Sequence, residues 1–147
     1  MEPDELDRRI LDLLRGDGQL GHAEIGRRVG LTGPAIHARV RRLERAGVIL
    51  GYGARISEEA TGRPLLGFVR VTTRPLPKET ETFEAYALAE PRIAECHDVD
   101  GEDSFVLKVR CASPEDLRAL LVEIRALPTV VRTVSSIALV TVKEGRT

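Results

Sequence analysis

Aromatic side chains are scarce in this sequence, at 3% of 147 residues, and tryptophan is absent. So few flat rings do not build the stacking platforms on which many proteins hold single-stranded nucleic acid, which argues against that class. Apolar runs of the roughly 18 residues that a membrane helix needs are also missing, so we expect no membrane partner. The first residues, MEPDELDRR, are acidic and contain no apolar segment, so we expect no secretory signal and a cytoplasmic protein.

Cysteine is nearly absent too, and Cys96 and Cys111 each lie alone in an apolar, strand-like stretch. They are expected to be buried free thiols, as in a reducing cytoplasm, and the Cys96-His97 pair has no group placed to orient a nucleophile. His22, His37 and His97 fall on separate elements without the spacing of zinc ligands. The sequence therefore predicts no metal, no cofactor and no enzyme.

What the sequence does contain is an uneven distribution of charge. The formal net charge is only −1, yet residues 22–55 hold seven arginines and two glutamates. Residues 1–21 and residues 56–147 each carry a net excess of three acidic residues. One basic block in a nearly neutral chain is typical of proteins that bind a polyanion.

The first half of the chain predicts a winged helix-turn-helix, expected as a domain over residues 1–56. Apolar residues recur at helical spacing over 4–15 and 22–29, and Thr32 is a good N-cap for a third helix after a tight turn. A two-stranded wing over 48–56 completes the order. The face of the third helix expected to point to the core is formed by Ile36, Val40, Leu43 and Gly47.

After a polar linker over residues 57–64, the pattern changes to alternating strands and helices. The order βαββαβ is that of a ferredoxin-like domain, expected over 65–143 and followed by a tail of 144–147. The chain is therefore predicted to be an α+β protein with two domains. The expected strands are 65–73, 92–99, 104–112 and 130–143, and the expected helices are 78–90 and 113–127.

The third helix carries four arginines within seven positions, and only Glu44 offsets them nearby in the sequence. A helix-turn-helix places this helix in the major groove, where arginine reaches guanine edges or phosphates. The small residues at its start let the backbone approach base edges. A solvated charged face is the alternative, which the one-sided charge disfavours. The candidate DNA-binding residues are Arg27, Arg28, Thr32, Gly33, Pro34, His37, Ala38, Arg39, Arg41, Arg42, Arg45 and Arg55.

These motifs identify a family resemblance. The block RVRRLERAGVI, followed by Gly51-Tyr52, resembles the N-terminal half of the Lrp/AsnC (feast/famine) transcriptional regulators. The segments LLGFVRV, ECHDVDGEDSFVLKVR and VVRTVSSIALVTVK resemble their C-terminal ligand-sensing and dimerisation domain, so the resemblance runs from about Leu6 to Lys143. It implies a sequence-specific regulator of transcription that binds double-stranded DNA. It also implies a homodimer, often a ring of dimers such as an octamer, with an amino acid bound between dimers.

The sequence departs from the family pattern in two places. Thr32-Gly33-Pro34-Ala35-Ile36 replaces a Ser-Pro opening of the recognition helix, so the operator preference is not carried over. The family's effector loop runs Gly, acid, any residue, Asp, aromatic, whereas here Ser104 stands in place of the second acid, or that acid is displaced by one position to Asp103. Exposed backbone donors and an acid suit an amino acid, but the same residues are ordinary in a hairpin turn. The candidate effector-binding residues are Gly101, Glu102, Asp103, Ser104, Phe105, Ser135 and Ser136.

Two other functions stay open at this point. Some proteins that resemble this family are sirohaem decarboxylases, in which a basic patch would bind acidic propionates in place of phosphates. Few histidines or tyrosines are available for such acid–base chemistry. A partner subunit that has lost DNA binding is the other alternative. The leading hypothesis is a dimer that docks on a pseudo-palindromic duplex, with two recognition helices in major grooves about one helical turn apart.

Overall fold

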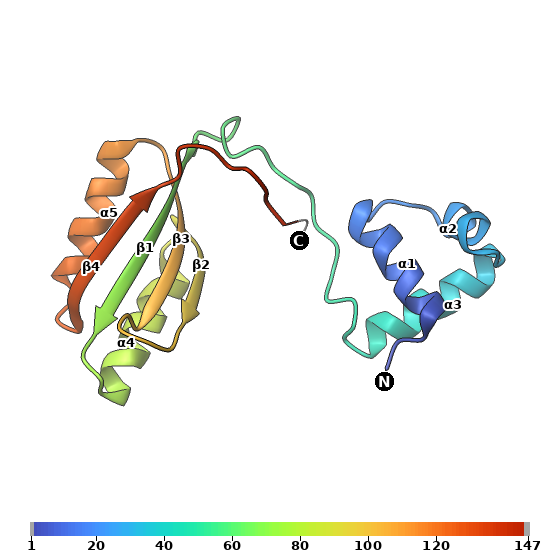
Figure 1. Ribbon diagram of the computed structural model, residues 1–147, viewed down its shortest axis with the longest axis horizontal. Coiled ribbons are helices and arrows are strands. Elements are labelled where there is room, and N and C mark those ends of the chain that lie inside the picture. Colours follow the sequence, from blue (N-terminus) through green and yellow to red (C-terminus); the bar gives the residue numbers. More distant parts are fainter. Residues whose placement is uncertain (1, 146–147) are drawn as a thin grey trace. The chain divides into compact units, whose positions relative to one another are not determined.

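The computed structural model describes residues 2–145, which form two compact units, residues 2–55 with 143–145 and residues 56–142 (Figure 1). The described elements follow the predicted order of a helix-turn-helix and a βαββαβ domain. The first unit contains α1 (Glu5–Gly16), α2 (His22–Val29) and α3 (Gly33–Arg45). The second contains β1 (Leu65–Thr73), α4 (Pro77–Ala89), β2 (Ile93–Asp98), β3 (Phe105–Cys111), α5 (Pro114–Ala126) and β4 (Val130–Ile137).

The helices of the first unit pack around a small aliphatic core. Ile10 of α1, Ile25 of α2 and Ile36 of α3 are fully buried, and the predicted core positions Val40 and Leu43 are buried as well. Burying an aliphatic side chain of this size stabilises a fold by about 1.5–3 kcal/mol. The fourth predicted core position, Gly47, is wrong, because it lies beyond the end of α3 at Arg45 and is exposed. The other three positions fix which face of α3 is left to solvent.

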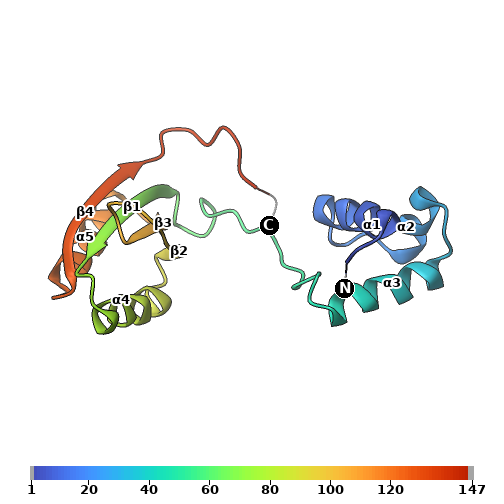
Figure 2. The same cartoon turned by 60° about the horizontal axis from the view of Figure 1, so that its bottom comes forward.

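The turn between α2 and α3 depends on two glycines. A Cβ on Gly26 would collide with the carbonyl oxygen of Leu31, so a larger residue does not fit there. Gly30 ends α2 with a φ of 79°, a conformation that favours glycine. Thr32 caps α3 as predicted, because its hydroxyl accepts a hydrogen bond from the Ala35 N–H at 3.4 Å. In the view of Figure 2, α3 runs beneath α1 and α2.

The predicted wing over residues 48–56 is wrong, since none of these described residues forms a strand. The N–H groups of Val48 and Ile49 donate to the Leu43 carbonyl at 2.9 and 3.2 Å, so they close the end of α3. Beyond them, Leu50 and Tyr52 are exposed. A two-stranded hairpin without an apolar face to cover is marginal in water, which explains why the alternation in the sequence does not become a wing.

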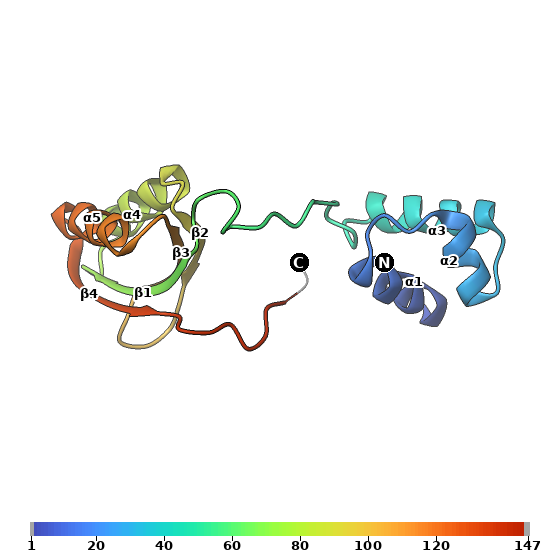
Figure 3. The same cartoon turned by 90° about the horizontal axis from the view of Figure 1, so that it is seen from above.

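The second unit is an antiparallel sheet with the strand order β2-β3-β1-β4 in the described chain. Strands β1 and β3 pair from Leu65 opposite Cys111 to Val71 opposite Phe105. Helices α4 and α5 both cover one face of this sheet, as Figure 3 shows from above. This is the predicted ferredoxin-like arrangement.

The covered face of the sheet holds the larger core. Val69 of β1 and Leu107 of β3 are fully buried under the helices, whereas Phe68, on the opposite face, is 43% exposed. Cys111 is buried in this core and Cys96 is half-buried beside it, and both are free thiols, as predicted. Burial raises the pKa of each thiol, which disfavours the nucleophilic thiolate.

Strand β4 ends earlier than the predicted end at Lys143. Its ladder with β1 stops at Ile137, which lies opposite Gly67. The Ala138 N–H still donates to the Leu66 carbonyl at 2.9 Å. Because β1 begins at Leu65, the following residues of the chain have no strand to pair with, and their apolar side chains, Val140 among them, are exposed.

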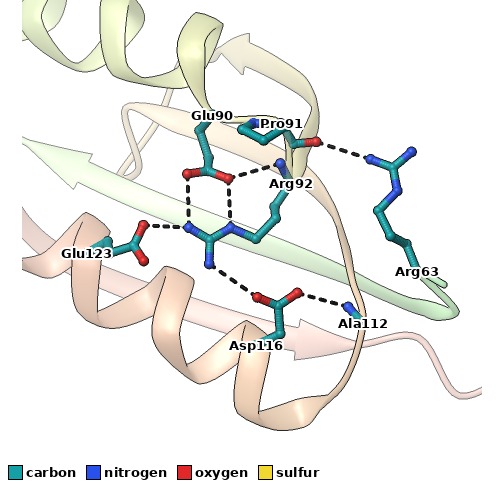
Figure 4. A network of polar contacts seen from close by, with 7 residues as sticks. All are labelled: Arg63, Glu90, Pro91, Arg92, Ala112, Asp116 and Glu123. Atoms are coloured by element: carbon teal, nitrogen blue, oxygen red, sulfur yellow. Dashed lines mark hydrogen bonds and ion pairs between the residues drawn. The ribbon is translucent and has the colours of Figure 1, made fainter.

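Arg92, just before β2, joins the two helices of the sheet unit (Figure 4). Its guanidinium donates to Glu90, at the end of α4, from Nε at 2.7 Å and from Nη2 at 2.9 Å. It also donates to Asp116 of α5 at 3.2 Å and to Glu123 of the same helix. The hydrogen bonds from Arg92 hold the pKa of Glu90 below its ordinary value, so this carboxylate is charged at neutral pH.

Candidate nucleic-acid interface and effector loop

The side of α3 opposite its buried stripe carries residues expected to contact DNA. Pro34, His37, Ala38, Arg41 and Arg45 are all exposed there. The face combines small residues at the helix start with a histidine and two arginines farther along. A second helix of a helix-turn-helix uses such a face to enter the major groove, because its N-terminal residues approach base edges.

Two arginines of α3, Arg39 and Arg42, point away from this face and contact the start of α1. Arg39 Nη1 lies 2.7 Å from Asp4 Oδ2 and 2.8 Å from Asp7 Oδ1. Arg42 Nη2 lies 2.7 Å from Asp7 Oδ2. Asp7 is almost completely buried, with 1% of its surface exposed. The hydrogen bond from Arg39 lowers the pKa of Asp4, and the two carboxylates raise the pKa of Arg39.

Three further arginines near the turn pair with acids of their own helix. Arg41 forms an exposed ion pair with Glu44, one turn along α3, at 3.2 Å. On α2, Arg27 and Arg28 donate to Glu24 at 2.8 and 2.6 Å. These hydrogen bonds, that from Arg27 first, lower the pKa of Glu24 to about 2. These three ion pairs lie at the surface, where water and salt compete with the pairing.

The expectation that only Glu44 offsets the arginines of α3 is therefore wrong. Asp4 and Asp7 neutralise Arg39 and Arg42, and neither acid was among the candidates from the sequence. The signal that points to them is the acidic block over residues 1–21 next to the basic block. Asp4 also caps α1, and the Asp7 carboxylate accepts from the Asp4 N–H in a capping box, so local helix chemistry accounts for both acids without this second role.

Three other candidates differ in their surroundings. His37 stacks edge-on against His22 of α2, with ring centroids 5.0 Å apart. Gly33 lies against the backbone of Ala23, which brings the start of α3 close to α2. Arg55 is exposed beyond the end of α3, in the segment expected to form the wing.

The candidate effector loop joins β2 to β3, and its acids differ in their surroundings. Gly101 adopts a φ of 116° at the tip of the loop, and Glu102 is exposed. Asp103 turns inward, where Thr72 and Arg132 both donate to its Oδ1 at 3.3 Å. Arg70 lies 3.7 Å from its other oxygen. The charge of Asp103 is thus already neutralised within the chain, which leaves Glu102 as the exposed acid among the candidate residues 101–105, with Asp100 exposed just before them.

Ser104 and Phe105 are fixed by the sheet. The Ser104 hydroxyl accepts a hydrogen bond from the Thr73 N–H at 3.0 Å, and the Ser104 N–H donates to the Val71 carbonyl at 2.9 Å. Phe105 is 1% exposed and its ring lies 4.7 Å from that of Phe83. Phe105 therefore packs mainly in the core, and it contributes to a surface only along one groove.

That groove lies between α4 and β2 and has a volume of about 400 Å³. Its floor is apolar and its rim is acidic, and the sequence alone did not indicate it. The residues that line it include Glu84, Leu88, Ile93, Cys96, Asp98 and Phe105.

The two candidate serines of β4 are not brought to the loop within one chain. Ser135 lies opposite Val69 and Ser136 opposite Phe68, whereas the loop meets the sheet at Val71. Strand β1 lies between β3 and β4, so it separates these serines from the start of β3.

Other kinds of site are absent from the described residues. Within residues 2–145, no three His, Cys, Asp or Glu side chains gather in a way that holds a metal ion. In the same range, no helix combines the length and apolar character needed to cross a bilayer. His97 lies on β2 of the second unit, whereas His22 and His37 lie on helices of the first. It contacts Glu95 on its own strand at 3.4 Å.

Comparison with known proteins assigns both units to one family. An AsnC-type helix-turn-helix domain matches residues 4–44, and the Lrp/AsnC ligand binding domain matches residues 66–147. The HTH-type transcriptional regulator LrpA of Mycobacterium tuberculosis is 41% identical over 144 residues, which is 97% of this chain and 94% of that protein.

Solved structures agree with this assignment. A transcriptional regulator from Neisseria meningitidis in complex with L-Met superposes with a TM-score of 0.93 at 26% identity, covering 97% of this chain and 93% of that one. The feast or famine regulatory protein from M. tuberculosis complexed with L-methionine gives 0.86 at 38% identity, covering 99% and 98%. Each of the proteins named here is a regulator by name. The chain belongs to the Lrp/AsnC family of helix-turn-helix transcriptional regulators.

Proposed function

We propose that this regulator binds duplex DNA in the cytoplasm through the exposed face of α3, as a homodimer whose two recognition helices enter successive major grooves. The observation that carries the proposal is that Arg41, Arg45 and His37 are exposed on the face opposite the buried stripe. Arg27 and Arg28 lie on the adjoining helix and extend the basic surface. Phosphate contacts set the register on the duplex, and base contacts by α3 supply selectivity.

The salt dependence of binding tests this proposal. If a dimer contacts about eight phosphates, log K falls with log[salt] at a slope of about −7. Substituting Arg41→Ala and Arg45→Ala together removes about four of these contacts and makes the slope shallower by about 3–4. Fluorescence anisotropy with a duplex selected from a random-sequence pool measures both quantities.

A matched control removes the same charge elsewhere. Arg74→Ala with Arg118→Ala takes two exposed arginines from the sheet unit, and we expect the slope to stay as in the unsubstituted chain. A slope near zero for the unsubstituted chain contradicts the proposed DNA binding. Equal losses in the two double variants contradict the assignment of α3 as the contact helix.

We further propose that an α-amino acid binds at the loop over residues 101–105 and regulates DNA binding. Gly101 leaves backbone N–H groups accessible to a carboxylate, and Glu102 is the exposed acid that would accept from the ammonium group. Because Ser135 and Ser136 lie apart from this loop in one chain, the complete site would form between subunits of a larger oligomer, such as a ring of dimers. The L-methionine held by two structural neighbours supports this class of ligand.

A thermal-shift screen of the twenty amino acids tests the effector site. A ligand that binds only the native state raises Tm, and we expect at least one amino acid to do so by several degrees. Glu102→Gln should abolish the shift, whereas Glu81→Gln, an exposed acid of α4, should leave it intact. No shift with any amino acid, or a shift unaffected by Glu102→Gln, contradicts the proposed site and leaves the DNA-binding proposal standing.

A further inference from the structure

The four arginines of α3 fall into two sets according to what they contact. Arg41 and Arg45 are exposed, and Arg41 pairs with Glu44, one turn along the same helix. Arg39 and Arg42 contact carboxylates of α1, more than thirty positions earlier in the chain. We propose that Asp7 is a positioning residue that withholds Arg39 and Arg42 from DNA by holding both guanidinium groups against α1. This inference rests on the proposed DNA binding and deepens it.

Both oxygens of Asp7 are fully used inside the unit. Oδ1 accepts from Arg39 at 2.8 Å, and Oδ2 accepts from Arg42 at 2.7 Å and from the Asp4 N–H at 3.1 Å. The Asp7 N–H in turn donates to Asp4 at 2.8 Å. The first turn of α1 therefore fixes the position of the carboxylate. The side chains of Arg39 and Arg42 extend from α3 to reach it.

The exposure of the partners explains why these two arginines stay in place. Asp7 is 1% exposed, whereas the side chains of Arg39 and Arg42 are 25% and 44% exposed. If either arginine moved to a phosphate, it would leave a buried carboxylate with less compensation, which is costly in a protein interior. The partner of Arg41 is near the surface on the same helix, so exchanging it for a phosphate costs little.

The consequence is electrostatic. Asp4, Asp7, Arg39 and Arg42 form a cluster with two negative and two positive charges, which adds no net attraction for DNA. Sequence-independent binding grows with the number of arginines that reach phosphates, and a regulator must keep that part small relative to specific binding. Asp7 thereby limits α3 to the arginines of its exposed face.

Two matched substitutions on α3 test the proposal. Arg45→Gln should make the salt slope shallower by about 1 for each subunit, or about 2 for a dimer, because a phosphate contact is lost. Arg42→Gln, three positions earlier, should leave the slope unchanged. Both side chains are exposed enough to be replaced without unfolding the unit, which circular dichroism checks. Equal changes of slope in the two variants would overturn the proposal.

A substitution of Asp7 itself should change the salt slope of DNA binding in the opposite direction. In Asp7→Asn, Asp4 still holds Arg39, but Arg42 is released. Binding to a random-sequence duplex should become tighter at low salt, and its slope should become steeper by about 2 for a dimer. A purely structural role for Asp7 lowers stability and leaves the slope as it was, so an unchanged slope in a folded variant overturns the proposal.

The control for this variant is Asp12→Asn. Asp12 lies on the same helix and pairs only with Arg15 at 3.1 Å, so its removal changes the net charge equally without releasing an arginine of α3. An equal steepening in Asp12→Asn would also overturn the proposal. If Asp7→Asn does not fold, the salt slopes of Arg42→Gln and Arg45→Gln decide whether the proposal holds. A slope near zero in the unsubstituted chain contradicts the proposed DNA binding itself and removes the basis of this inference.

Discussion

Each unit of the molecule holds one charged side chain among several of the opposite sign, and the two arrangements are inverted. In the helical unit, the carboxylate of Asp7 accepts from two arginines of α3. In the sheet unit, the guanidinium of Arg92 donates to three carboxylates, two on α5 and one at the end of α4 (Figure 4). Both arrangements join elements far apart in the sequence.

The difference lies in which partner is buried. Asp7 is enclosed and its arginines reach toward the surface, so the cluster controls what that surface offers to a polyanion. Arg92 is itself only 19% exposed, and Glu90 beside it is 11% exposed, so that network faces inward and serves the fold. The same ion-pair chemistry therefore has a different role in each unit, and the comparison can be tested by removing the central residue of each.

The largest effect is expected for Arg92→Met. The substitution leaves three neighbouring carboxylates without their cation, two of them largely buried, and should lower the free energy of unfolding of the sheet unit by about 3 kcal/mol. The chain has two tyrosines and no tryptophan. In a Tyr52→Phe background, the fluorescence of Tyr86 reports the urea unfolding of this unit alone.

Arg63→Met is the matched control for that prediction. Arg63 lies beside the same network, where it donates to the Pro91 carbonyl at 3.2 Å and pairs with Glu58, but its side chain is 42% exposed. Its removal should cost less than about 1 kcal/mol. Equal losses for Arg92→Met and Arg63→Met would mean that the Arg92 network contributes no more than a surface pair.

A smaller effect is expected for Asp7→Ala in the helical unit. The substitution removes one hydrogen bond of the capping box and the ion pairs of Asp7 with Arg39 and Arg42. Arg39 still pairs with Asp4, and the guanidinium of Arg42 becomes hydrated instead. We expect a loss of about 2 kcal/mol in the free energy of unfolding of this unit. Urea unfolding followed by Tyr52 in a Tyr86→Phe background measures it.

Asp12→Ala serves as the control, because Asp12 is exposed and pairs with a single arginine of its own helix. Its loss should be below about 0.5 kcal/mol. A larger loss for Asp7→Ala than for Arg92→Met would reverse the comparison, and would mean that the two arginines are stabilised mainly by the buried acid rather than by solvent.

The elements of both units could be predicted from the sequence because local patterns specify them. Helical spacing and the cap at Thr32 place α3 correctly, and alternation with the acidic turn at Asp100 places the hairpin of β2 and β3. The buried stripe of α3 followed from the same spacing. Where a local pattern had no tertiary partner, as in the wing over residues 48–56, the prediction was wrong.

The contacts of the site could be predicted only in part. The exposed face of α3 follows from the position of its core stripe, but the partners of Arg39 and Arg42 are 32 to 35 positions away. Similarly, the neutralisation of Asp103 needs Arg70 of β1 and Arg132 of β4, which only the sheet order brings together. A count of charges along the chain cannot reveal which of them cancel in space.

The smallest effect concerns Glu24, which repeats the Asp7 arrangement at the surface. Hydrogen bonds from Arg27 and Arg28 lower its pKa to about 2, well below its ordinary value. A lowered pKa in the native state means that Glu24 stabilises the unit above pH of about 4.5 and that this contribution is lost as the pH falls toward 2. Glu24→Gln should therefore unfold at lower urea concentration than the unsubstituted chain at neutral pH, by a small margin that shrinks on acidification.

Urea midpoints followed by Tyr52 in the Tyr86→Phe background, between about pH 6 and pH 2.5, measure this margin. High salt should reduce it as well, because the pair is solvent-exposed and screened, whereas the Asp7 contribution should resist salt. A margin that persists at acid pH would show that Glu24 acts through its helix position rather than its charge. A loss of stability in Glu24→Gln as large as that in Asp7→Ala would show that burial does not distinguish the two clusters. Surface and interior ion pairs would then contribute equally to the stability of this unit.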